Sequence, residues 1–180
     1  MSQPNASFRK LLEYEERALA FQPGKGTGVE RTGEWAGVIF AIGDSRLTCS
    51  IDRVHEFLPP PPVTRVPGTK PWVLGMANVR GDLVTIVDLS CYLGGERTAI
   101  TVRSRLLAAS LRGRPVGLLV DEVFGQRSFN SEESKKVETD EDSPFHNYIN
   151  RQFRSKNEVW QVLDLDALFG TPEFLNGAAA

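Results

Sequence analysis

Two short motifs occur twice along this chain, in the same order, and this repetition limits the folds that it can adopt. Ile51-Asp52-Arg53-Val54 corresponds to Val120-Asp121-Glu122-Val123, 69 residues later. Val87-Asp88-Leu89 corresponds to Leu163-Asp164-Leu165, 76 residues later. The difference of seven residues indicates an insertion in the second copy. We place it at Ser131–Ser143, which is charged and nearly free of apolar residues and should be a solvated loop. The sequence therefore predicts two copies of one small unit.

Short apolar segments with a period of two surround both motifs and predict strands. Val38, Phe40 and Ile42 share one face of the first strand, and Gly43-Asp44 turns into the next. The second copy has matching strands at Leu106–Leu111, Val116–Val120, Tyr148–Phe153 and Val159–Leu163. Because roughly seventy residues provide only a small core, the two copies should share apolar surface. We predict a mainly β fold of two small antiparallel barrels packed together.

The stretch from Val63 to Leu89 carries the clearest hairpin pattern. A short apolar segment, Val73–Ala77, precedes the polar corner Asn78–Asp82, and a continuous apolar run follows at Leu83–Val87. Such a run, bounded by Gly and Asp, is typical of a strand buried on both sides. The hairpin tip therefore places Arg80, a planar cation suited to bidentate recognition, on a rigid support. After the hairpin, Asp88 and Asp164 should each cap a short helical turn.

The ends of the chain differ in composition from its middle. Ser7–Phe21 reads as an amphipathic helix, and the Gly-rich segment after it reads as a linker, so residues 1–33 form an N-terminal helix and linker. One domain is placed at 34–170, made of two intertwined barrel subdomains at about 34–100 and 101–170, and 171–180 is taken as a C-terminal tail. Pro59–Pro62 forces a polyproline II connector, although it could also be a ligand for an aromatic-lined groove.

The totals favour a protein of the cytoplasm that binds no nucleic acid. The net charge is −2, without the basic excess of a nucleic-acid-binding domain. Apolar runs stay under about ten residues, far below the ~20 that span a bilayer, and the N-terminus lacks the order of a secretory signal. Cys49 and Cys91 form no C-x-x-C motif, and both are expected to be buried, inert thiols.

No set of residues in the sequence suggests catalysis. His55 and His146 are the only histidines, and neither has a metal-ligand partner at a suitable spacing. His55 is expected on the surface of a strand. The glycines form neither a dinucleotide-binding motif nor a phosphate loop. Asp164-x-Asp166 could hold a cation, but its duplicated setting favours a cap. We predict no enzyme activity, no cofactor and no required metal.

A binding module is left as the main functional class. Interface energy concentrates in aromatic and arginine anchors, and the candidates are Trp72, Phe57 and Arg80. Trp72 could instead plug one barrel end, and Arg80 could instead form a structural salt bridge with Asp82 or Glu56. A small barrel that binds nucleic acid or peptides is an alternative class, and an unrecognised enzyme is another.

The hairpin region also carries a family resemblance. The order T-R-V-P-G, a tryptophan, G-x-x-N-x-R-G and then I-V-D-L resembles the signature of the CheW family of chemotaxis coupling proteins, and the resemblance extends over Trp35–Gly170. Within the family, A-N-V-R-G after P-G-T-K-P-W is similar to the members of type IV pilus chemosensory systems, which drive twitching motility. The chain departs from the family in its longer N-terminus, in Val79 where leucine is common, and in the acidic insertion.

The resemblance implies a fold and a set of partners. The expected fold is two SH3-like five-stranded barrels with a hydrophobic groove between them. The expected partners are the regulatory domain of a CheA-like histidine kinase and the cytoplasmic tip of a methyl-accepting chemoreceptor. The protein would then join receptor arrays at the inner face of the membrane without inserting into it. The family's coupling-sensitive positions correspond to Gly75, Asn78 and Arg80, and its acidic position corresponds to Glu56, with Phe57 beside it.

Overall fold

The computed structural model describes residues 33–137, 143, 145–155 and 158–178. The helix predicted at Ser7–Phe21 and nearly all of its linker lie outside these residues. The strands are β1 (Glu34–Ile42), β2 (Ser45–Ser50), β3 (Val54–Leu58), β4 (Val73–Val79), β5 (Asp82–Asp88), β6 (Arg105–Leu111), β7 (Arg114–Val120), β8 (Glu122–Asn130), β9 (Ser134–Lys136), β10 (Ile149–Ser155) and β11 (Glu158–Leu163). The helices are the 3-10 turns η1 (Ile51–Arg53) and η2 (Ser131–Glu133), and α2 (Leu89–Tyr92), α3 (Leu165–Gly170) and α4 (Pro172–Ala178).

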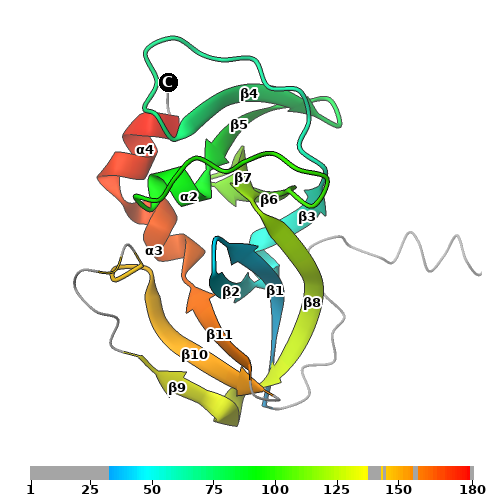
Figure 1. Ribbon diagram of the computed structural model, residues 1–180, viewed down its shortest axis with the longest axis vertical. Coiled ribbons are helices and arrows are strands. Elements are labelled where there is room, and N and C mark those ends of the chain that lie inside the picture. The colour runs from blue at the N-terminus through cyan, green and yellow to red at the C-terminus, as the bar shows by residue number, and fades with distance from the viewer. Residues whose placement is uncertain (1–32, 138–142, 144, 156–157, 179–180) are drawn as a thin grey trace, which may run out of the picture.

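The strands form two sheets, one above the other in Figure 1, with α2, α3 and α4 along one side. The five-stranded sheet has the order β3-β6-β7-β5-β4, and the six-stranded sheet has the order β8-β1-β2-β11-β10-β9. The predicted mainly β, two-unit fold is confirmed. Two features differ from the prediction. Each sheet contains one parallel pair, β5 with β7 and β2 with β11, among its antiparallel pairs. The predicted loop Ser131–Ser143 also contributes β9, which pairs with β10 at the sheet edge.

The two copies of the repeat exchange hairpins. The first copy runs β1-β2-β3 and then β4-β5-α2, and the second runs β6-β7-β8 and then β10-β11-α3. The β6–β7 hairpin of the second copy lies between β3 and β5 of the first, and β1–β2 of the first lies between β8 and β11 of the second. The boundary predicted near residue 100 therefore separates the repeats but not the sheets, because each sheet is completed by strands of the other copy.

Both sheets curl around a small core of their own. In the five-stranded sheet, apolar side chains from all five strands form one cluster, made of Leu58, Leu74, Ala77, Val79, Val84, Ile86, Leu106 and Leu119 with Val63. In the six-stranded sheet, Phe129 on β8 stacks on Phe153 of β10 at 4.7 Å between ring centroids. We refer to the two sheets as the five-stranded barrel and the six-stranded barrel. A third and larger cluster joins them, with Phe40, Leu47, Leu107 and Leu118 among its members, which confirms the predicted shared surface.

Three local predictions need correction. Residues 171–180 are not a simple tail, because α4 inserts the fully buried Phe174 into the shared core. The nine-residue strand β8 was not predicted, since Gly125 and the polar run at 126–128 interrupt its apolar residues. Cys49 is buried as expected, but Cys91 is only half-buried because it lies on a single-turn helix at the surface. By contrast, Asp88 and Asp164 both cap short helices as predicted.

Candidate partner-binding site

The β4–β5 hairpin ends in a tight turn that holds Arg80 at its tip. Val79 pairs with Asp82, so Arg80 and Gly81 are the two turn residues. Their φ angles are 52° and 99°, the pair of positive values found in the primed turns that match strand twist. A left-handed backbone costs a non-glycine residue about 1–2 kcal/mol. The side-chain Oδ1 of Asn78 offsets part of this cost, because it accepts a hydrogen bond from the Gly81 N–H at 3.0 Å.

Gly75 lies on the same hairpin and is required by its packing. Its φ is 140°, and a side-chain carbon there would overlap the backbone carbonyl of Thr64. Thr64 and Met76 exchange two backbone hydrogen bonds of 2.8 Å each along the outer edge of β4. The absence of a side chain at Gly75 therefore lets the preceding segment protect an edge strand. Gly75 shapes the hairpin that carries Arg80.

Glu56 and Arg80, both predicted site residues, are brought together across the barrel. Glu56 lies on β3, at one edge of the five-stranded sheet, and Arg80 lies at the tip joined to β4, the other edge. Their side chains form an ion pair of 2.6 Å, with exposed fractions of 77% for Arg80 and 26% for Glu56. Of the two acids considered for a structural salt bridge, Glu56 is the one that pairs. Exposed ion pairs contribute only about 0–1 kcal/mol to stability, so this contact orients the guanidinium more than it stabilises the fold.

Two exposed apolar side chains lie on the strands that carry this pair. Phe57 follows Glu56 on β3 and is 39% exposed. Leu83 is opposite Asn78 in the hairpin register and is 62% exposed. Leu83 opens the run predicted to be buried, but burial in fact begins at Val84. The exposure of Leu83 could have been inferred from its position next to Asp82, because both residues lie at the start of the strand, outside the core.

Trp72 lies apart from these residues, inside the shared core. It is 5% exposed, stacks on Phe174 at 5.5 Å and meets Tyr92 edge-on at 5.0 Å. This placement matches the alternative in which Trp72 plugs the barrel end. The structure thus gathers Glu56, Asn78 and Arg80 at one end of the five-stranded barrel, with Phe57 and Gly75 on the same strands. We call Glu56, Phe57, Asn78 and Arg80 the hairpin site.

A groove of about 590 Å³ lies between the five-stranded barrel and α4. Met76 and Leu83 line it from the hairpin strands, and Leu175 lines it from α4. Arg112 and Arg114, at the β6–β7 turn, add positive charge to its wall. An apolar floor beside arginines suits a helix that has an apolar face and acidic neighbours.

The described residues offer little to a catalytic site. They contain no group of three or more His, Cys, Asp or Glu side chains placed to hold a metal ion. His55 is exposed on β3, where it was expected. Burial raises the pKa of the Cys49 thiol to about 12, so this group stays protonated near neutral pH and is a poor nucleophile. None of the helices in the described part of the chain is both long and apolar enough to cross a bilayer.

Comparisons with known proteins by sequence and by structure point to the same family. The model of the CheW-like domain matches residues 36–173. The chain is 30% identical to Protein PilI of Pseudomonas aeruginosa over 178 residues, which cover 99% of both chains. It is 24% identical to the chemotaxis protein CheW of Bacillus subtilis, over 77% of this chain and 88% of that protein. The scaffolding protein TtCheW from Thermoanaerobacter tengcongensis has a similar structure, with a TM-score of 0.69, 19% identity, and coverage of 77% of this chain and 94% of that one.

Proposed function

Because this chain belongs to the family of CheW-like domains, we propose that it is a non-catalytic adaptor that couples a chemoreceptor to a histidine kinase. The receptor would be of the methyl-accepting type, engaged through its cytoplasmic tip, and the kinase would be CheA-like, engaged through its regulatory domain. The protein would work in the cytoplasm, in arrays at the inner face of the membrane, and control twitching motility by type IV pili.

The observation that carries this proposal is the full-length similarity to Protein PilI. The aligned region includes the N-terminal segment that precedes the family domain, since it spans 99% of each chain while the domain model begins at residue 36. A relative that shares only the CheW-like domain would support an adaptor role without favouring one pathway. Similarity over the whole chain, including the extension, supports the pilus-related pathway.

The hairpin site supports the receptor-binding half of the proposal. Arg80 is exposed, is held in direction by Glu56, and stands on a turn whose backbone is fixed by Asn78. An anchored guanidinium loses little conformational entropy when it meets a carboxylate or backbone carbonyls of a partner. Phe57, which follows Glu56 on β3, adds an exposed apolar side chain to the same strand. We assign Glu56, Phe57, Asn78 and Arg80 to the receptor tip, and leave Trp72 and Gly75 as supports of the fold.

The test combines binding and stability of Arg80→Ala. An arginine at the centre of an interface commonly costs ~2–4 kcal/mol when truncated, or about thirty- to a thousandfold in affinity. Titration against a purified receptor tip fragment should show a loss of this size. Titration against the kinase regulatory domain should show little change if the two partners bind different faces. The melting temperature should stay within a few degrees of the wild type, because the ion pair that is lost is exposed.

Arg127→Ala is the matched control. Arg127 forms an ion pair with Glu158 in the six-stranded barrel, at 3.4 Å. Its removal deletes an ion pair, and a cation–π contact with Phe129, away from the hairpin site, so receptor affinity should be kept. Unchanged receptor affinity in folded Arg80→Ala would remove the anchor role. Failure of the wild-type protein to bind either fragment would remove the adaptor proposal itself.

A further inference from the structure

The segment between α2 and β6, residues 96–104, exposes two apolar side chains that neither the core nor the hairpin site uses. We call it the connector. Ile100 is 64% exposed and Val102 is 92% exposed, which makes Val102 the most exposed of the large apolar side chains in the described residues. Single exposed apolar residues are common on protein surfaces and need no explanation. Two of them, separated by one residue on one segment, are informative only if the backbone that carries them is held in place.

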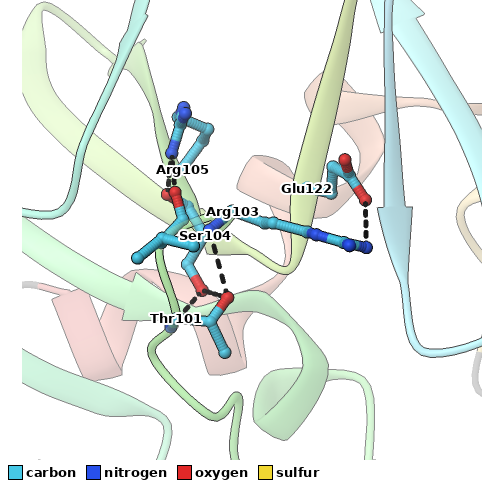
Figure 2. A network of polar contacts seen from close by, with 6 residues as sticks. Thr101, Arg103, Ser104, Arg105 and Glu122 are labelled. Carbon is cyan, nitrogen blue, oxygen red and sulfur yellow. Dashed lines mark hydrogen bonds and ion pairs between the residues drawn. The ribbon is translucent and has the colours of Figure 1, made fainter.

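Buried polar groups hold the connector at both ends. At its start, the fully buried carboxylate of Asp88 accepts hydrogen bonds from the Thr98 N–H at 2.9 Å and from the Thr98 hydroxyl at 2.8 Å. At its end, the fully buried Ser104 hydroxyl oxygen accepts from the Thr101 N–H at 2.9 Å. Figure 2 shows Thr101 and Ser104 facing one another across this turn. A buried network in which each polar group has a partner fixes the local backbone.

Two arginines complete the arrangement. The Arg105 guanidinium donates hydrogen bonds of 2.8 Å to the carbonyls of Val102 and Ser104, which ties down the backbone that carries Val102 (Figure 2). Arg103 is 74% exposed and extends toward Glu122, with 3.8 Å between the charged groups. That separation is long for a charge-assisted hydrogen bond, so the Arg103 guanidinium keeps donors to offer. The connector therefore presents two apolar side chains and a positive charge on a pre-organised backbone.

The second copy has no equivalent segment within the described residues, because Thr171 leads directly from α3 into α4. The connector also ends next to the hairpin site's strand. Leu106, one residue into β6, pairs with Leu58 at the end of β3, and Ala108 pairs with Glu56. A partner lying along β3 over Glu56 and Phe57 would meet the connector as it passed the end of that strand.

We propose that the connector is a second contact for the receptor tip, with Ile100 and Val102 inserted into an apolar strip between carboxylates on the receptor's helices. This inference rests on the proposed function, because it extends the surface given to that partner. A second copy of this chain is a poorer match. The walls of its apolar groove carry Arg112 and Arg114, which would face Arg103 with like charge.

The experiment titrates three variants of the full chain against the purified receptor tip fragment and the kinase regulatory domain. The double variant Ile100→Ser/Val102→Ser should bind the receptor fragment about ten- to a hundredfold more weakly, with unchanged kinase binding. The conservative variant Ile100→Leu/Val102→Ile keeps apolar area and should bind like the wild type. Phe124→Ser removes an exposed aromatic of the six-stranded barrel, which is 41% exposed, and should also bind like the wild type. The two connector variants should melt near the wild-type temperature, since Ile100 and Val102 are outside the core. Phe124→Ser should melt somewhat lower but remain folded, because its ring contacts Trp160 and Arg46.

A charge variant separates the two parts of the contact. Arg103→Glu should weaken receptor binding at low salt and lose most of this effect at high salt, where an exposed charge is screened. Receptor affinity unchanged in the double serine variant, while Arg80→Ala loses it, would overturn the connector's role and leave the proposed function intact. A loss of kinase binding instead would assign the connector to the other partner and overturn the inference as stated. If size-exclusion chromatography shows a change of oligomeric state with unchanged receptor affinity, the connector is a self-association contact and the inference fails.

Discussion

The two barrels have the same arrangement of elements and differ in the role of one equivalent residue, which is Asp88 in the first copy and Asp164 in the second. Both place an aspartate at the end of a central strand, where it begins a short helix. The Asp88 N–H donates to the Trp72 carbonyl at 2.8 Å, and the Asp164 N–H donates to the Tyr148 carbonyl at 2.8 Å. Trp72 and Tyr148 are themselves 76 residues apart, the same offset as the two aspartates. The backbone setting is therefore the same in both copies.

The side chains of the two aspartates have different tasks. Asp164 accepts hydrogen bonds of 3.0 Å from the N–H groups of Asp166 and Ala167, which is an ordinary helix cap. Asp88 caps its helix through Cys91 and, in addition, holds the connector through both polar groups of Thr98. One copy of the residue serves a helix, and the other also serves a loop that faces solvent. The residue has the same position in both copies, and Asp88 has more partners than Asp164.

The ion pairs of the two barrels show a second difference. In the five-stranded barrel, the acid is on the edge strand β3 and the arginine is at the hairpin tip. In the six-stranded barrel, the arginine is on the edge strand β8 and the acid, Glu158, opens β11 beside the hairpin turn. Each residue of the second bridge lies two positions beyond the exact equivalent of the first, and the two charges are exchanged between the edge strand and the hairpin end. The two barrel ends therefore present opposite charge patterns, which favours different partners at each end.

The largest expected effect comes from the bulge that both barrels share. The register shifts between Val73 and Gly75 in β4, and at the equivalent place between Ile149 and Arg151 in β10. Gly75→Val should lower the melting temperature by about 10 °C or more, because the new side chain meets the Thr64 backbone at a φ that strains it, and several kcal/mol are lost. Arg151→Ala, at the matching position, removes cation–π contacts with Trp35 and Phe153 and should cost only about 1 kcal/mol. Thermal unfolding of both variants checks the contrast. Equal losses would mean that the Thr64 contact does not distinguish the two bulges.

The next effect concerns the two aspartates. Asp88→Ala should destabilise the protein by about 3 kcal/mol, because it leaves the buried Thr98 groups and the helix N-terminus without their acceptor. Asp164→Ala should cost about 1 kcal/mol, the usual value for a helix cap. Urea denaturation measures both free energies. Hydrogen exchange should in addition show faster exchange across the connector in Asp88→Ala alone; protection retained there would argue that Asp88 does not anchor the segment.

The smallest effect on stability is expected from the two ion pairs. Double-mutant cycles on Glu56 with Arg80, and on Arg127 with Glu158, should each give a coupling below about 1 kcal/mol that fades in high salt. Exchanging the charges, with Glu56→Arg and Arg80→Glu together, should restore the coupling and still abolish receptor binding, since the polarity presented to the partner is reversed. Recovery of receptor binding in the exchanged variant would show that the partner recognises the ion pair itself, whichever of the two positions carries the positive charge.

The sequence predicted the features that local chemistry determines. The hairpin from Val73 to Asp88, the tip position of Arg80 and the two capping aspartates follow from apolar runs, turn residues and the repeat. The salt bridge of Arg80 with Glu56 was among the alternatives considered. The two subdomains were expected to be intertwined, but the hairpins that they exchange could not be predicted, because the repeat tells which residues are equivalent and not which copy supplies their strand partners. Leu83 and Phe174 were misplaced because burial at the end of a strand or in a short C-terminal helix depends on what the rest of the chain brings to that point.

The exchanged hairpins have a consequence for how the chain acquires its structure during synthesis. Trp35, near the start of β1, pairs with Phe129 of β8, and Leu47 of β2 pairs with Gln161 of β11. The first hairpin to leave the ribosome therefore has no sheet to join until residues 81 to 114 positions later have been made. At about 5–20 residues per second, that delay lasts several seconds. During this interval the apolar faces of β1 and β2 are open to chaperones. A chain that stopped at the repeat boundary would contain part of each barrel and would complete neither of them.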